Sequence, residues 1–178
     1  MRMEELREKY ENLMEAFSLL RALGIPIGLE VSRMFVDEKG RVNVHGTVLM
    51  GREFRTELEI LLTEAFNDVL SAPEHFRDDL KGLADAVRED AGRYEEETGG
   101  DVADFVILVM LTQVLAGIVA TASGIPPSEV AKHMDPLYKV AGMLLGTYKE
   151  DRELRDEYEL WRSQAELLLK QLKRMRLL

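Results

Sequence analysis

The sequence has no cysteine among its 178 residues. This absence excludes disulfides, thiolate metal sites and thiol nucleophiles. Histidine is scarce as well, because His45, His75 and His133 are far apart and none belongs to the HExxH pattern of helical zinc hydrolases. We therefore expect no catalytic residue, no metal ligand and no cofactor, and we favour a protein that is not an enzyme.

Basic residues are also in deficit. Asp and Glu number 33 against 23 Lys and Arg, which gives a net charge of −10. Such a balance repels phosphate backbones, so a nucleic-acid partner would need a local basic patch. The N-terminal residues MRMEELREKYENL are charged and lack the apolar core of a signal peptide, so we expect a cytoplasmic protein.

Charge is missing altogether from one long stretch, which is the main feature of the sequence. Residues 101–124 read DVADFVILVMLTQVLAGIVATASG, and no charged residue follows Asp104 until Glu129. The length would suffice for a membrane span. However, Thr112 and Gln113 lie in its middle, and no lysine or arginine cluster flanks it. We expect a buried central helix with Asp101 as its N-cap, and no membrane span.

The remaining segments are expected to cover this helix. Residues 29–50 predict a β-hairpin, because Val42, Val44, Gly46 and Val48 alternate with polar residues. The other segments have helical periodicity. The predicted fold is mainly α: a single domain over residues 1–178, built as a helical bundle around helix 101–124. The hairpin 29–50 is an insertion, and residues 149–178 form a charged, heptad-patterned, long amphipathic helical tail.

This tail has the clearest coiled-coil-like pattern in the chain. Its apolar positions recur at spacings of three and four, and the expected oligomer-interface residues are Leu154, Tyr158, Trp161, Leu168, Leu172 and Met175. Such a row of residues can pair with the similar pattern at residues 6–20 within one chain or with another copy. A second feature of the tail is the basic group Lys170, Lys173, Arg174 and Arg176, which suits a helix C-terminus or an acidic partner.

Residues 119–137, VATASGIPPSEVAKHMDPL, resemble the helix-turn-helix of winged-helix regulators of bacteria and archaea. Val119-Ala120 falls at that family's apolar and small pair, Gly124-Ile125 at its turn, and Val130, His133-Met134 and Leu137 in its recognition helix. The resemblance covers about a tenth of the chain. It implies a nucleic-acid-binding surface that contains Ser128, Lys132 and His133, together with the basic group of the tail. The alternative is that these residues are ordinary solvated helix positions.

A second, fainter resemblance concerns the start of the central helix. Asp101-Val102-Ala103-Asp104, after the acidic run 95–97, which we expect in a surface loop, is similar to the second metal motif of all-α nucleotide pyrophosphohydrolases. In that family carboxylates hold magnesium. The first motif, a pair of glutamates on the preceding helix, is not intact here, so we favour helix capping for Asp101 and Asp104.

We therefore expect a non-catalytic interaction or assembly subunit that forms a homo-oligomer or binds a protein partner. Two alternatives stay open. One is a helix-turn-helix transcriptional regulator with nucleic acid as its partner, and the other is a magnesium-dependent nucleotide pyrophosphohydrolase-like enzyme.

Overall fold

The structure is a computed structural model that describes residues 2–178, with side chains from residue 3 onward. The elements are, in chain order, α1 (Arg2–Ala22), β1 (Ile27–Val36), β2 (Val42–Met50), α2 (Arg52–Ser71), the 3₁₀ turn η1 (Pro73–Phe76), α3 (Arg77–Thr98), α4 (Val102–Ser123), α5 (Pro127–Val130), the 3₁₀ turn η2 (Ala131–His133), α6 (Met134–Glu150) and α7 (Arg155–Arg174). This is the predicted, mainly α-helical fold with a small hairpin.

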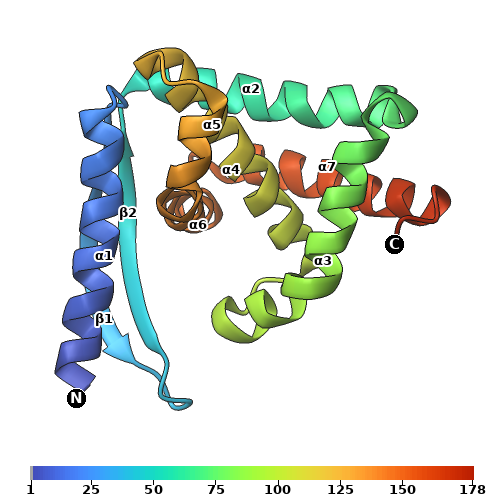
Figure 1. Cartoon of the computed structure of the whole chain (residues 1–178). Coiled ribbons are helices and arrows are strands. Elements are labelled where there is room, and N and C mark those ends of the chain that lie inside the picture. Colours follow the sequence, from blue (N-terminus) through green and yellow to red (C-terminus); the bar gives the residue numbers. More distant parts are fainter. Residues whose placement is uncertain (1) are drawn as a thin grey trace.

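The helices pack around α4, as Figure 1 shows. α2, α3, α6 and α7 all contact α4, while α1 and the hairpin lie at one side and pack chiefly on α6. α2 and α7 run side by side in the same direction (Figure 1), and Trp161 of α7 hydrogen-bonds Thr63 of α2. Buried side chains of all these elements form one continuous hydrophobic cluster. The predicted bundle around a buried central helix is therefore confirmed.

α4 begins and ends as its sequence requires. The Asp101 carboxylate accepts a hydrogen bond from the backbone N–H of Asp104, 3.1 Å away, and so caps the helix. Gly124 ends it with φ +69°, a conformation that glycine adopts without strain. By length and composition this helix could cross a membrane. In the fold residues 103–108 are all buried, whereas Gln113 and Gly117 further along are exposed. The sequence therefore predicted the core position of the first half better than that of the second.

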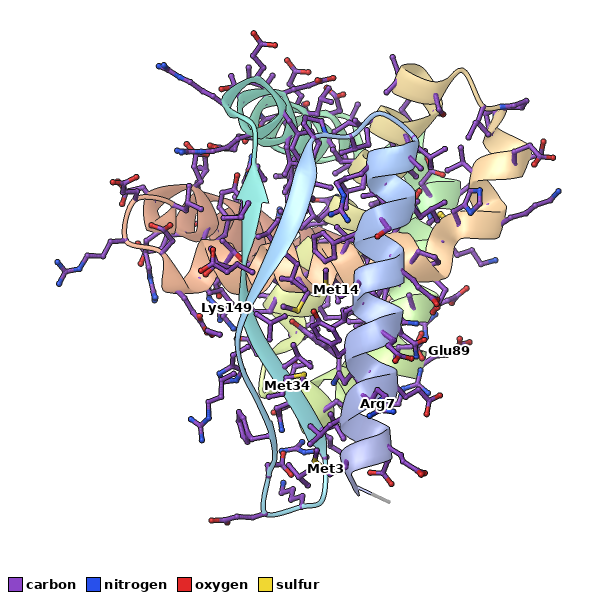
Figure 2. All side chains as sticks on the ribbon, turned by 90° about the vertical axis from the view of Figure 1, so that its left-hand side faces the viewer. Met3, Arg7, Met14, Met34, Glu89 and Lys149 are labelled. Carbon is purple, nitrogen blue, oxygen red and sulfur yellow. The ribbon has the colours of Figure 1, made fainter. Side chains whose placement is uncertain are left out.

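The two strands form an antiparallel pair, with Leu29 opposite Val48 and Val36 opposite Val42. A bulge at Ser32 interrupts the register between Val31 and Arg33. Figure 2 shows how strongly the hairpin twists beside α1. Val48 is buried, and its backbone N–H donates to the Thr147 hydroxyl of α6 over 2.9 Å. This contact helps to fix the hairpin on the bundle, which an isolated hairpin needs for stability.

Two predicted boundaries are wrong. Residues 95–97 were expected in a loop, but α3 continues to Thr98 and ends at Gly99, because glycine tolerates the left-handed φ of +77°. The tail was expected to be helical from residue 149, but α6 ends at Glu150 and a turn separates it from α7. The Asp151 carboxylate stabilises this turn by accepting a hydrogen bond from the N–H of Glu153.

Glycines do not mediate the contact between α4 and α6. Gly117 and Gly142 are exposed, and a Cβ atom added at either glycine would meet nothing within 4 Å. The two helices do pack together, but through large side chains such as Leu111, Leu137 and Leu144, all of which are fully buried. Large aliphatic side chains bury more apolar surface than glycines do, so they determine which faces of the two helices pack together.

The end of α7 allows a first prediction. Arg176 has φ +58°, and the N–H groups of Arg176 and Leu177 bond to the carbonyls of Lys173 and Leu172. This is a Schellman motif with arginine where glycine is favoured. We expect Arg176→Gly to stabilise the chain by about 0.5–1 kcal/mol, measured by chemical denaturation. Arg174→Gly, at the last position of the helix, should instead cost up to about 1 kcal/mol. Destabilisation by both variants would contradict the interpretation.

Candidate functional site

The apolar row of α7 that was expected at an oligomer interface lies inside the chain itself. Tyr158 and Leu154 are only 4% exposed, and Trp161, Leu168 and Leu172 are fully buried, while Met175 is half-buried. These side chains face α2, α4 and α6. Burying a continuous apolar row against neighbouring helices of the same chain removes much apolar surface from water. An interface between copies through this row would require α7 to leave the bundle.

The opposite face of α7 carries a second row, which the sequence analysis missed. We call it the outer row: Asp156, Leu160, Ser163, Leu167, Lys170 and Arg174. All six side chains are exposed, and they recur at spacings of four and three. Leu160 is 45% exposed and Leu167 is 54% exposed. Two leucines one heptad apart on the surface of a helix can form the apolar centre of a helix-pairing face. This spacing was the available signal, hidden by the stronger inner row.

Charge on the outer row is separated along the helix. An acid, Asp156, stands before the two leucines, and two bases, Lys170 and Arg174, stand after them. Among the residues that the structure describes, none of these three charges has an ion-pair partner. The row therefore offers an apolar centre with free charges of opposite sign at its two ends.

The helix-turn-helix segment has a different geometry from the one that its resemblance implies. After Gly124, α5 is a single α-helical turn, followed by the 3₁₀ turn η2 and then by α6. Ser128 and Lys132 are exposed and His133 is half-buried, but they lie on two short turns and not on one recognition helix. Lys132 pairs with Glu129 at 3.1 Å, which neutralises its charge. Pro127 and Pro136 lack backbone N–H groups, which favours such short segments.

The basic group of the tail lies far from this segment. Lys170, Lys173, Arg174 and Arg176 are exposed around the C-terminal end of α7. Figure 1 shows that end on one side of the molecule and α5 on the opposite side. The residues predicted to contact nucleic acid are therefore not brought together into one surface, and each group would have to act separately.

Asp101 and Asp104, the carboxylates with a metal-motif spacing, belong to a cluster of charged residues with Lys149, Tyr158 and Arg162. Asp104 is 3% exposed. Its Oδ2 accepts a hydrogen bond from Lys149 Nζ at 2.9 Å, and its Oδ1 accepts from the Tyr158 hydroxyl at 2.5 Å and from Arg162 at 3.2 Å. The Arg162 guanidinium also pairs with Asp101. Two acids and two bases thus balance one another.

This cluster explains why the Asp101 side chain stays ionised. Hydrogen bonds from the Arg162 guanidinium lower the pKa of Asp101 to about 2, so this carboxylate is ionised over the whole neutral range. Both acids are occupied by cationic side chains of α6 and α7, and no group of three metal-binding side chains occurs among residues 3–178. The arrangement therefore joins the start of α4 to α6 and α7 by charge.

Three tyrosines around the core are shielded from water. Burial raises the pKa of both Tyr94 and Tyr158 to about 12, and it also raises the pKa of Tyr148, whose hydroxyl has no hydrogen-bond partner in the described structure. Tyr148 lies against Trp161, with ring centroids 4.7 Å apart. A phenolate at these positions would lose its hydration, so the neutral form is favoured in the folded state.

These tyrosines predict a loss of stability in alkali. A folded pKa near 12 against about 10 in the unfolded chain means that the unfolded state loses its protons first as pH rises. The stabilisation is complete below pH 10 and disappears as pH rises from 10 through 12. We expect tyrosinate absorbance at 295 nm to appear together with loss of helical circular dichroism in this range. Full ionisation of all tyrosines with the helices intact would contradict this expectation.

Comparison of the chain with protein-family models, curated proteins and solved structures finds no match. In the geometry described above, the outer row of α7 is an exposed helix face with two leucines at its centre.

Proposed function

We propose that the protein is a non-catalytic assembly subunit whose α7 outer row binds a helix of another copy of the same chain. The observation that carries the proposal is the exposure of Leu160 and Leu167, one heptad apart, on a helix whose opposite face is buried in the core. Two exposed leucines on a helix that is anchored by its opposite face need no reorganisation before they bind, which lowers the entropic cost of association.

The charged cluster and the helix-turn-helix segment give less support to the other functions. Asp101 and Asp104 already bind cationic side chains, and Lys132 is paired with Glu129. In contrast, the outer row ends in charges that have no partner within residues 3–178. Unpaired charges beside exposed leucines are what an interface between helices uses to select its partner.

The test measures molar mass by light scattering as the protein concentration rises. We expect the wild type to exceed the chain mass of 20.3 kDa, and the double variant Leu160→Glu with Leu167→Glu to stay at that mass. Glutamate in an apolar helix interface would be buried without a partner. Leu49→Glu is the matched control, because Leu49 on β2 is similarly exposed, at 52%, but lies outside the outer row. A wild type that keeps the single-chain mass at every concentration would refute the proposal.

A further inference from the structure

We infer that the outer row of α7 pairs with the outer row of α7 in a second copy of this chain, with the two helices antiparallel and crossing at Ser163. This inference rests on the proposed function and adds to it the identity and the direction of the bound helix. It follows from the symmetry of the row itself.

The outer row is nearly symmetric about its middle residue, except that the charge is negative at one end and positive at the other. Its middle member is Ser163, with Leu160 and Leu167 on either side and then Asp156 on one end and Lys170 on the other. When two such helices run antiparallel around Ser163, Leu160 of each copy meets Leu167 of the other. Asp156 of each copy then lies beside Lys170 of the other, and Arg174 lies just beyond it.

Parallel pairing would give the opposite result. Asp156 would then face its own copy, and Lys170 and Arg174 would face theirs, so like charges would meet at both ends of the row. The sign change along α7 therefore selects the antiparallel direction. It also selects two copies, because a two-fold axis makes one surface complementary to itself.

The middle of the row suits a helix crossing. Ser163 is exposed and small, and its hydroxyl donates to the carbonyl of Glu159 within the same helix at 3.1 Å. It therefore needs no partner across the interface and allows the helix backbones to approach each other. The neighbouring charges Arg162 and Glu166 pair within α7 at 3.6 Å and so do not have to be buried unpaired.

The row is also held rigidly in place. On the other side of α7, Trp161 and Leu168 are fully buried, and Gln164 hydrogen-bonds Asn67 of α2 at 2.9 Å. The helix has 20 residues, a length of about 30 Å. Two such helices can therefore align the apolar centre and both charged ends in one contact without any change in the bundle.

The absence of native cysteine makes a direct test simple. In Ser163→Cys the two new thiols would lie together at the two-fold axis, so mild oxidation should link most of the protein into a covalent dimer. Thr121→Cys, exposed at the end of α4, is the control and should stay uncrosslinked under the same conditions. Equal crosslinking of both variants, or none in either, would overturn the inference.

Charge exchange tests the direction of the helices independently. Asp156→Lys alone and Lys170→Glu alone each place like charges together, and each should weaken the dimer by about tenfold or more. An equimolar mixture of the two variants should restore the wild-type affinity, because each heterodimer regains two opposite-charge pairs. With parallel helices, neither single variant would weaken the dimer, because like charges already meet at both ends of the wild-type row, and the mixture would bind more tightly than the wild type.

The outcomes separate this inference from the proposed function. If the wild type assembles and the Leu160 and Leu167 variant does not, but charge exchange has no effect, then the outer row binds a helix in another arrangement and the inference fails alone. If the wild type keeps the single-chain mass at all concentrations, both fail. Dimerisation with recovery in the mixture supports both.

Discussion

Replacing Asp104 with alanine is expected to lower the free energy of unfolding by about 3–5 kcal/mol. The carboxylate is buried and accepts hydrogen bonds from Lys149, Tyr158 and Arg162. Without it, two cations and a tyrosine hydroxyl lose their common partner near the core, and a cavity forms at the start of α4. Urea denaturation followed by circular dichroism at 222 nm measures the change.

Asp101→Ala is the matched control for this experiment. Asp101 pairs with the same arginine and caps the same helix, but its side chain is 48% exposed, so water can replace it. Loss of the cap should cost about 0.5–2 kcal/mol. Equal losses for the two variants would show that the buried position of Asp104 is not what makes the cluster important for stability.

The second large effect is expected for Trp161→Ala, which should cost about 3–5 kcal/mol. Trp161 is fully buried between α2 and α6, where it lies against Tyr148 and donates its indole N–H to the Thr63 hydroxyl at 3.2 Å. Its removal leaves a large cavity and an unpartnered hydroxyl. Thermal unfolding followed by circular dichroism measures the loss, since the variant has no tryptophan fluorescence.

Ile60→Ala provides the comparison for Trp161→Ala. Ile60 is an apolar residue of α2 but is 51% exposed, so its truncation should change stability by less than about 0.5 kcal/mol. A small effect of the Trp161 variant, close to that of the Ile60 variant, would mean that α7 is not an integral part of the core.

The sequence alone was sufficient to predict the central helix and the hairpin. Helix 101–124 is visible because a long apolar run with a capping aspartate and a final glycine has few alternatives in a folded chain. The hairpin is visible because alternation over residues 42–48 has a period that no helix shares. Both signals are local, and both were confirmed to within two residues at most boundaries.

Helix ends were harder to predict where local preferences conflict. Residues 95–97 are three successive glutamates, which suggest a solvated loop, yet glutamate is a good helix former and α3 continues through them. Around residues 151–154 the alternation of charges favours a continuous helix, but the structure has a turn there. Arg155 stabilises the turn by donating to the carbonyl of Lys149 at 2.8 Å. Such a contact exists only once the turn has formed.

The packing partner of α7 could not be deduced from its heptads. Its inner row, which includes Trp161 and Leu168, was correctly identified as a packing face, but the sequence does not say whether the packing partner belongs to the same chain. The inner row has far more apolar surface, so the chain uses it for its own core. The weaker outer row, with Leu160 and Leu167, then remains exposed, and the proposed function assigns it to a partner.

The charged cluster could not be predicted from local sequence patterns, for a different reason. The sequence shows the capping relation between Asp101 and Asp104, but the cations that surround Asp104 come 45 and 58 residues later in the chain. Neither Lys149 nor Arg162 differs in its sequence context from the many surface lysines and arginines. Only the packing of α6 and α7 around the start of α4 distinguishes them.

This long separation has a consequence for the order in which the molecule folds. As a carboxylate, Asp104 is stable in the apolar interior only together with Lys149 and Arg162, because an ionised group without cations would be strongly disfavoured there. We therefore expect the first turn of α4 to become protected from water only when α6 and α7 pack against it, which hydrogen exchange during refolding can measure. We therefore expect the docking of α7 to complete the core, since its Arg162 completes the neutralisation of Asp104.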